Sequence, residues 1–326
     1  MTQGEKEILV NRLKNLFDND AVEIVPASDG YHNQVFIITT SKEKLVARLS
    51  LQTKRTKEEL KSELKWIMTL CAVGIQVAKP KIVIGYDLIF ELDTEENDYW
   101  VTFFEHTRGR PLDVMDHSEW NEEIFQEWGR QIACMHNVKT TGINRHVYLD
   151  SEERKKTIFA EAWLNRKHEQ LINEMATWSR TPETFGLIHN DLHQGNFHLN
   201  ENGIIFFDLD DCTYHFYSQD LAVSIYHALW TGKSFHPESG SFPYEFLTSF
   251  LMGYASKRRL NADMYKQLQV CLQMREVYLY SLFVLKWLPD DMMDWQAYKL
   301  EELKGNCIAG IIPYKEELEK VKYLFN

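Results

Sequence analysis

Four polar side chains lie close together in one short segment, G-L-I-H-N-D-L-H-Q-G-N-F, which spans residues 186 to 197. They are His189, Asp191, His193 and Asn196. Three more carboxylates follow in F-F-D-L-D-D, at Asp208, Asp210 and Asp211. Two like charges about 4 Å apart repel by roughly 4 kcal/mol at an effective dielectric constant of 20. The gathered oxygens therefore predict a bound cation, and Mg²⁺ characteristically combines one or two carboxylates with phosphate oxygens and water.

The spacing inside this segment is informative. Asp191 and Asn196 are five positions apart, as in the kinase catalytic loop, where the Asp handles the acceptor hydroxyl and the Asn holds magnesium. For the loop alone, a turn whose polar side chains satisfy local backbone groups is the simpler alternative. The apolar run I-I-F-F-D reads as a strand, and strand alternation would put Asp208 and Asp210 on one face.

Upstream residues supply a phosphate-binding set. Arg48 lies at the end of the strand-like run L-V-A-R-L, and Glu63 follows fifteen residues later on a predicted helix. Such a pair would hold the α- and β-phosphates of a nucleotide. The first hairpin, P-A-S-D-G-Y-H-N-Q-V-F, could cover phosphates through backbone amides near Ser28 and Gly30, although its single glycine does not match G-x-G-x-x-G.

Together these motifs resemble the aminoglycoside phosphotransferase and choline kinase-like family, which has the protein-kinase-like fold. The family loop reads H-G-D-L-H-x-x-N and its metal strand I-D-F-D or I-D-W-E. The helix E-W-G-R-Q-I-A-C-M-H and the run from Leu60 to Pro80 are similar to family segments as well. The resemblance covers about residues 20 to 230 and extends to homoserine kinase type II-like enzymes and bacterial stress-response kinases.

The resemblance implies a role for each matching position. Asp191 would be the catalytic base, and Asn196 and Asp208 would be magnesium ligands. The supporting residues would be His189, Asp210, which could assist a second metal, and Asp220. Nucleotide contacts would come from Ser28, Gly30, Arg48, Glu63, Phe104, Glu105 and His106. This sequence departs from the family at Arg48, where Lys is usual, and at Asn190, where Gly is usual; the forked donors of Arg suit phosphate.

The surrounding elements predict an α+β protein with two lobes. Strand-like runs at 22–25, 35–39 and 44–49, then two more before residue 105, alternate with helices at 5–17 and 57–73. Beyond residue 105 helical periodicity dominates, with helices expected at 120–135, 158–178, 219–230, 243–256, 261–287 and 313–324. We expect residues 1–105 to form a small antiparallel β-sheet lobe that binds nucleotide. Residues 106–326 would form a larger helical lobe with the catalytic loop, the metal strand and the acceptor pocket.

Composition limits the partners. The net charge of −12 and the pI near 5.5 oppose binding to nucleic acid or anionic lipid. Five scattered cysteines without a C-x-x-C pair fit a reducing cytoplasm, and neither a secretory signal nor a membrane span is expected. The sequence leaves the oligomeric state open.

The predicted activity is transfer of the γ-phosphoryl group of ATP, with GTP as the alternative nucleotide and Mg²⁺ as cofactor. The acceptor would be a hydroxyl of a small molecule: an amino alcohol, an amino acid, an aminoglycoside-like compound or another cationic ligand. Candidates for its pocket are Asp210, Tyr214, His215, Trp230, Glu276, Tyr280 and Trp287. A stripe on the predicted helix at 261–287 is better explained by core packing: Met274, Tyr278, Leu282 and Leu285.

Four alternatives fit the sequence less well than this prediction. A protein Ser/Thr kinase of the bacterial stress-response type would need an activation segment ending in A-P-E, which is not evident. A non-catalytic nucleotide-binding module would normally lack the base or the metal ligands. T-G-K-S at 231–234 lacks the first P-loop glycine, because position 227 is His227. A zinc site at the loop histidines lacks the usual ligand spacing.

Overall fold

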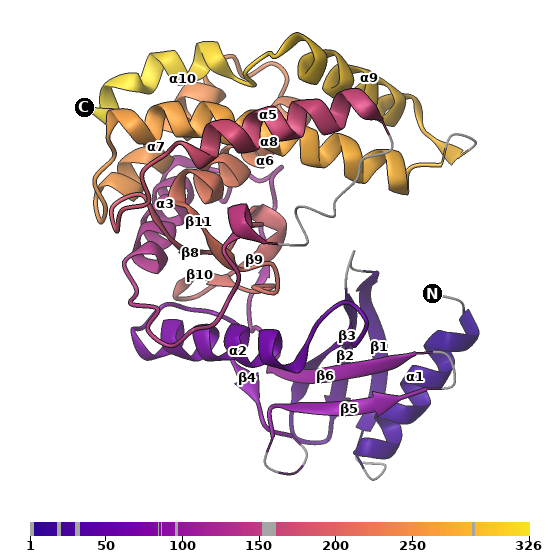
Figure 1. Ribbon diagram of the computed structural model, residues 1–326. Coiled ribbons are helices and arrows are strands. Elements are labelled where there is room, and N and C mark those ends of the chain that lie inside the picture. The colour runs from indigo at the N-terminus through magenta and orange to yellow at the C-terminus, as the bar shows by residue number, and fades with distance from the viewer. Residues whose placement is uncertain are drawn as a thin grey trace. The chain divides into compact units, whose positions relative to one another are not determined.

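The computed structural model describes residues 3–17, 21–29, 33–83, 85, 87–94, 97–151, 161–288 and 291–326. The chain forms two compact units, whose elements are labelled in Figure 1. The first unit contains residues 1–110, 140–145 and 198–210, and the second contains 111–139, 146–197 and 211–326. The assignment of a nucleotide-binding lobe and an acceptor-binding lobe to the two parts of the chain stays a prediction.

The first unit is built on an antiparallel sheet with the strand path β1-β2-β3-β6-β4, and β5 also pairs with β6. Its strands are β1 (Ala21–Asp29), β2 (Asn33–Thr40), β3 (Lys44–Leu51), β4 (Pro80–Lys81), β5 (Ile89–Asp93) and β6 (Asp98–Glu105). Its helices are α1 (Gln3–Leu16) and α2 (Lys57–Ala72). A capping box begins α2, because Thr56 and Glu59 each bind the other's backbone amide.

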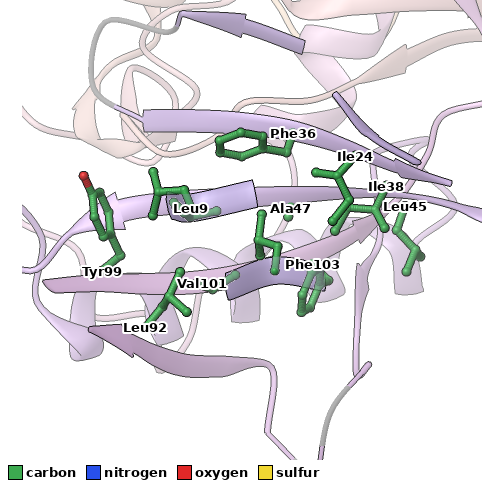
Figure 2. Packing of buried hydrophobic residues seen from close by; sticks show 12 residues of the cluster. Leu9, Ile24, Phe36, Ile38, Leu45, Ala47, Leu92, Tyr99, Val101 and Phe103 are labelled. Carbon is green, nitrogen blue, oxygen red and sulfur yellow. The ribbon is translucent and has the colours of Figure 1, made fainter. Parts of the chain in front are cut away.

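The two helices cover opposite faces of this sheet. Leu9 of α1 packs in one apolar cluster with Leu45 and Ala47 of β3 (Figure 2). Arg48 has the opposite parity along β3 and points to the other face, where it meets Glu63 of α2. Strand alternation thus presents a cation to α2 while its neighbours fill the core.

A second sheet has three strands in the order β10-β9-β7. It contains β7 (Arg110–Pro111), β9 (Phe197–Asn200) and β10 (Gly203–Phe206). The second unit adds the antiparallel pair of β8 (Phe185–Ile188) and β11 (Thr213–Phe216). Between β8 and β9 lies the segment that contains Asp191 and Asn196.

The rest of the second unit is helical. Its helices are α3 (Glu122–His136), η1 (Tyr148–Asp150), α5 (Ala162–Ala176), η2 (Gln194–Asn196), α6 (Tyr217–Phe235), α7 (Phe242–Ala255), α8 (Ala262–Lys286), α9 (Asp294–Ala309), α10 (Lys315–Val321) and η4 (Lys322–Phe325). Two glycines let α3 and α7 cross closely. A Cβ at Gly129 would lie 1.9 Å from the carbonyl oxygen of Phe250, and one at Gly253 would lie 1.9 Å from that of Gln126. Larger residues there would force the two helices apart.

The predicted fold class is confirmed: an antiparallel sheet precedes a mostly helical remainder. Helix α9 falls in a segment where no helix was predicted. The packing interpretation of the stripe on α8 is partly wrong, because Tyr278 is 41% exposed and Leu285 is 74% exposed. Ile158 of the predicted helix at 158–178 lies outside the described residues. In the part of the chain that the structure describes, no helix is long and apolar enough to cross a bilayer.

Candidate active site

The loop after β8 turns sharply at Asn190. Its φ of 73° lies in the left-handed region, where most L-residues are strained and where Gly, Asn and Asp are the usual occupants. Asn is therefore a suitable residue at this position of the loop, for which the resemblance implies Gly. The next residue, Asp191, is thereby placed with its side chain 32% exposed.

Asp220, in the first turn of α6, binds the backbone of the same loop. Its two carboxylate oxygens accept the amide protons of His189 (3.0 Å) and Asn190 (2.6 Å). Nε2 of His136, the last residue of α3, lies 3.0 Å from Asp220 Oδ2. Burial acts to raise the pKa of Asp220, but the bonds from His136 and the loop hold that pKa below its ordinary value. The buried carboxylate therefore fixes the loop geometry.

Asp191 is paired with Arg275 of α8. Arg275 Nη2 donates to Asp191 Oδ1 at 2.8 Å, and the Arg275 side chain is only 6% exposed. Burial would raise the pKa of Asp191, but the charge of Arg275 and the hydrogen bond from His193 outweigh it and hold the pKa well below its ordinary value. Asp191 is consequently ionised at neutral pH and fixed in direction.

Two neighbouring histidines have different hydrogen-bonding roles: His227 accepts from Arg275, whereas His193 accepts from a backbone amide. His227 Nε2 accepts a hydrogen bond from Arg275 Nε at 3.1 Å, and Arg275 Nη2 lies 2.6 Å from the same nitrogen. Because arginine can only donate, this ring nitrogen carries no proton. Burial and the charge of Arg275 lower the pKa of His227 well below its ordinary value. His193 uses Nδ1 to accept the amide proton of Gly195 at 3.0 Å, which leaves the proton on Nε2, 3.5 Å from Asp191 Oδ2.

Asn196 is oriented by the loop that precedes it. Its Nδ2 donates to the backbone oxygen of Asp191 at 2.8 Å and lies 3.4 Å from Asp191 Oδ2. The amide nitrogen is therefore turned toward Asp191, and Oδ1 is the atom that remains for a cation. An amide oxygen is a suitable ligand for a hard divalent ion.

In the first unit, Arg48 and Glu63 form a bidentate ion pair. Nη1 and Nη2 donate to the two carboxylate oxygens at 2.7 and 2.8 Å, and the side chains are 5% and 1% exposed. Burial acts to lower the pKa of Arg48, but Glu63 raises it further, so the guanidinium stays charged. Among the described residues, Arg48 Nε is a buried donor without a hydrogen-bond partner. An unsatisfied buried donor costs free energy that an anionic oxygen would recover.

The carboxylates after β10 do not follow strand alternation, because β10 ends at Phe206. Asp208 has a left-handed φ of 61° and is exposed, whereas Asp210 is buried. Asn33 Nδ2 donates to Asp210 Oδ2 at 2.6 Å, and Arg55 Nη2 lies 3.8 Å from the same oxygen. Burial acts to raise the pKa of Asp210, but the charges of Arg48 and Arg55 lower it below its ordinary value. The role of Asp210 at a second metal stays a prediction.

Three residues expected to contact the nucleotide, Phe104, Glu105 and His106, lie at the end of β6 or directly after it. Phe104 is buried, and the Arg48 guanidinium lies 5.1 Å from its ring centroid. The amide of Glu105 donates to the carbonyl of Lys79 at 2.8 Å, so this amide is already satisfied. Glu105 and His106 line a cavity of about 1440 Å³ that Arg48 and Glu63 do not line. Ser28 lies in β1, paired with Val35, and Gly30 is outside the described residues.

The residues predicted to line the acceptor pocket lie in different parts of the structure. Asp210 belongs to the first unit, and Tyr214 and His215 lie in β11, where burial lowers the pKa of His215 to about 3. The four others lie on or at the end of α6 and α8: Trp230, Glu276, Tyr280 and Trp287. Glu276 accepts hydrogen bonds from Tyr226 (3.2 Å) and Asn306 (3.0 Å).

The three histidines of the zinc alternative are His189, His193 and His198, and the last of them lies in β9. His189 Nδ1 accepts from the Asp191 amide at 3.4 Å, His193 binds Gly195, and His198 Nδ1 lies 2.9 Å from Thr107 Oγ1. No group of three or more His, Cys, Asp or Glu side chains that could hold a metal occurs within the described ranges.

Three site residues were missed by reading the sequence: Arg275, Asn33 and His136. Only His136 carried a signal, because it ends the family-like helix E-W-G-R-Q-I-A-C-M-H. Asn33 accepts from Ser50 at 2.7 Å while donating to Asp210. Nothing in the residues around Asn33 or Arg275 distinguishes them from ordinary polar positions.

Comparison with known proteins gives consistent results. The phosphotransferase enzyme family (APH) matches residues 23–250. Amicoumacin kinase of Bacillus subtilis (strain 168) is 25% identical over 276 residues, which are 82% of this chain and 80% of that protein. A solved amicoumacin kinase in complex with AMP-PNP, Ca²⁺ and Ami superimposes with a TM-score of 0.84 at 21% identity, covering 98% of this chain and 100% of that one. A microcompartment-associated aminopropanol kinase gives 0.68 at 19% identity, with coverages of 92% and 95%.

Proposed function

The chain belongs to the phosphotransferase enzyme family, as its motifs predict, and from this premise we propose that it phosphorylates a hydroxyl of a small, amine-bearing molecule at the expense of ATP. The family match and the curated relative bear out a small-molecule kinase. They favour this reading over the alternatives of a protein kinase and a non-catalytic module. The identity of the acceptor and the roles of individual residues are the proposed part.

The observation that carries the proposal is the state of Asp191. Its carboxylate is partly exposed, oriented by Arg275, and joined to Asn196 within one loop. A group with a strongly lowered pKa is a weak base in the ground state but a good hydrogen-bond acceptor. We infer that Asp191 orients the acceptor hydroxyl for in-line attack and takes its proton late. That timing suits a loose phosphoryl-transfer transition state, in which the nucleophile needs little deprotonation.

The phosphate-binding role is assigned to Arg48. Glu63 uses both terminal nitrogens of Arg48 and leaves Nε as the unsatisfied donor. An oxygen of the α- or β-phosphate would satisfy it through a charge-assisted bond. Glu63 would therefore set the direction of the guanidinium, and Arg48 would make the contact with the nucleotide.

We propose that Asn196 and Asp208 supply oxygen ligands to a divalent cation. Asn196 Oδ1 is turned away from the bonds its Nδ2 makes, and Asp208 presents an exposed carboxylate on a left-handed backbone. Carboxylate and amide oxygens are preferred ligands of Mg²⁺. Mg²⁺, when bound, would neutralise charge on the phosphate oxygens. We keep Asn196 and Asp208 as the proposed ligands and Mg-ATP as the proposed nucleotide.

The acceptor class rests on the relatives. The names of the compared proteins indicate amicoumacin and aminopropanol as acceptors of those enzymes. We propose that this chain likewise takes a hydroxylated amine. Because the relatives differ in acceptor, the compound itself must be found by a screen.

The test is ADP release from Mg-ATP with a panel of acceptors: choline, ethanolamine, 1-amino-2-propanol, amicoumacin, aminoglycosides and a generic protein substrate. We expect one small hydroxylated amine to stimulate ADP release and to appear as a phosphate monoester by mass spectrometry. Asp191→Ala should lower kcat on the order of 10² to 10⁴-fold while Mg-ATP binding persists in calorimetry. Stimulation only by the protein substrate, or unchanged turnover of Asp191→Ala, would contradict the proposal.

A further inference from the structure

The cavity of about 1440 Å³ that contains Glu105 and His106 has further residues in its walls. All of its described lining residues belong to the first unit and come from four segments: 42–44, 71–79, 105–110 and 199–205. None of Asp191, Asn196 or Asp208 is among them. The residues proposed to carry out the reaction and to bind the metal therefore leave this cavity unused.

The charge of the cavity lining is opposite to that of the chain. The sequence has 36 Lys and Arg against 48 Asp and Glu. The described lining has five cationic side chains, which are Lys42, Lys44, Lys79, Arg108 and Arg110, and three carboxylates, which are Glu43, Glu105 and Glu201. A concave surface with an excess of one sign concentrates the electrostatic potential. We call it the basic cavity, and its charge favours an anionic ligand.

The protein's own carboxylates do not neutralise these cations. Glu43 is already paired with Lys81, which lies outside the lining. Four of the lining cations are exposed and make no ion pair or side-chain hydrogen bond within the described part of the chain: Lys42, Lys44, Lys79 and Arg108. Like charges around one cavity repel each other. A bound anion would replace this repulsion with attraction.

Hydrogen bonds fix one wall of the basic cavity to β10. The amide of Ala78 donates to the carbonyl of Phe206 at 2.8 Å, and the amide of Phe206 donates to the carbonyl of Gln76 at 3.0 Å. The Gln76 side chain donates to the carbonyl of Asn202 at 2.8 Å and accepts from Asn200 Nδ2 at 3.1 Å. Binding of a ligand would therefore not have to order this backbone, which removes one cost of association.

The wall that contains Arg108 is held in a similar way. The amide of Glu105 donates to the carbonyl of Lys79 at 2.8 Å. A Cβ at Gly109 would lie 2.8 Å from the carbonyl oxygen of Leu199, so the chain passes close to β9 there. Arg108 and Lys79 thus lie on two segments that are joined by backbone contacts.

Size and chemistry narrow the class of ligand. The volume exceeds the 300–1,000 Å³ that is usual for small-molecule sites, so the basic cavity admits a molecule larger than inorganic phosphate. Among its described lining residues none is Phe, Tyr or Trp, so it offers no flat ring on which a nucleobase could stack. Phosphate groups carry close to two charges each at neutral pH and accept charge-assisted bonds from Lys and Arg.

We propose that the basic cavity binds a small molecule with two or more phosphate groups, at a site separate from that of Mg-ATP. The inference goes beyond the proposed function and does not depend on it, because the residues that carry it differ from those of the reaction. Glu105 and His106 line the basic cavity and are also expected to contact the nucleotide. Competition with a nucleotide is therefore the decisive control.

Calorimetry with the full chain, saturated with Mg-AMP-PNP, tests the proposal. Fructose 1,6-bisphosphate should bind with a Kd on the order of 0.1 mM, roughly tenfold more tightly than fructose 6-phosphate. Binding should weaken as the salt concentration is raised, because the lining cations are exposed. Tripolyphosphate is the second probe, and the tighter of the two compounds shows whether the phosphate groups belong to an organic or an inorganic ligand.

Charge reversal at two lining residues locates the site. Lys79→Glu combined with Arg108→Glu should raise the Kd for fructose 1,6-bisphosphate more than roughly tenfold, with the affinity for Mg-AMP-PNP and the melting temperature kept. The double variant Arg12→Glu, Lys14→Glu makes the same change of net charge at exposed positions of α1 outside the lining, and should bind as wild type. If charge reversal lowers the melting temperature, Lys79→Ala with Arg108→Ala gives the same comparison.

Four results would overturn the proposal. Neither probe binds the wild-type chain, or the two double variants lose affinity equally, which would indicate net charge rather than a site. Binding seen only without AMP-PNP would assign the probes to the nucleotide site. A hexaglutamate peptide that binds more tightly than both probes would make the basic cavity a site for acidic peptides. Acceptor-stimulated ADP release, the test of the proposed function, can succeed or fail independently of all four.

Discussion

Arg275 Nη2 donates to Asp191 Oδ1 at 2.8 Å although 84 residues separate the two positions in the sequence. The bond joins the middle of α8 to the loop after β8, and His227 of α6 accepts from the same guanidinium. Asp191 Oδ1 is therefore held by a short bond from the protein, whereas Oδ2 has longer contacts, from Asn196 Nδ2 at 3.4 Å and His193 Nε2 at 3.5 Å. This gives Arg275 a positioning role in the proposed reaction.

Replacing this arginine should impair turnover more than binding. In Arg275→Lys a point charge remains but the fork that spans Asp191 and His227 is lost, so we expect kcat to fall roughly tenfold with the KM for ATP little changed. Arg275→Ala also leaves the carboxylate without its cation, and kcat should fall on the order of 10²-fold. Steady-state kinetics with Arg259→Ala as the exposed-arginine control would measure both. Equal kcat for wild type and Arg275→Ala would remove Arg275 from the site.

The pH dependence of stability should report on Glu276. Burial raises the pKa of Glu276 to about 7, above its value in the unfolded chain, so the folded state binds this proton more tightly. The associated stability is fully present below the unfolded pKa and is lost as pH rises through about 7. Glu276→Gln cannot ionise. It should therefore be more stable than wild type at pH 8 by about 2 kcal/mol, with the advantage gone near pH 5.

Urea unfolding at both pH values would measure this difference. Glu301→Gln, on the exposed side of α9, is the control because its carboxylate is in solvent. A Glu276→Gln protein whose stability relative to wild type is the same at the two pH values would show that Glu276 does not titrate in this range.

Local sequence was sufficient to place the loop and the Arg48–Glu63 pair, because each lies on a pattern carried by a few neighbouring residues, and the bonds from Asp220 to the loop agree with what the family resemblance implied. Arg275 could not be found this way. It is one of many arginines on predicted helices, and only the packing of α8 beside α6 brings it to Asp191. A pairing created by tertiary structure leaves no trace in local sequence.

Helix α9 was missed for a different reason. Only Lys299, Leu303 and Cys307 of it are buried, so its apolar stripe is one residue wide and includes a lysine. Helical periodicity can be recognised in a sequence only when the apolar stripe is broader than this. Similarly, alternation failed at Asp208 and Asp210 because β10 ends at Phe206, and a left-handed residue after a strand cannot be inferred from its apolar run.

The Arg48–Glu63 pair should couple nucleotide binding to the stability of the first unit. Glu63→Gln removes the charge that compensates a buried guanidinium, and breaking a buried pair from one side costs about 3–5 kcal/mol. We expect a lower melting temperature and a KM for ATP raised about tenfold. Glu58→Gln, an exposed position on the same helix, is the control. If Glu63→Gln binds Mg-ATP as tightly as wild type in calorimetry, the pair does not direct Arg48 toward phosphate.

Asn190 offers the most selective test of the loop geometry, because its backbone rather than its chemistry is at issue. A φ of 73° is accessible to Gly without a Cβ penalty. Asn190→Gly should therefore keep kcat within about twofold of wild type and change stability by less than about 1 kcal/mol.

Asn190→Ala carries the steric cost of the left-handed region, about 1–2 kcal/mol. Asp220 Oδ1 accepts the Asn190 amide at 2.6 Å. The backbone strain would therefore be relieved only by lengthening or breaking this hydrogen bond. Asn190→Ala should then lose both stability, by urea unfolding, and turnover, since Asp191 is the next residue. Wild-type turnover in Asn190→Ala would mean that the left-handed turn is not needed to position Asp191.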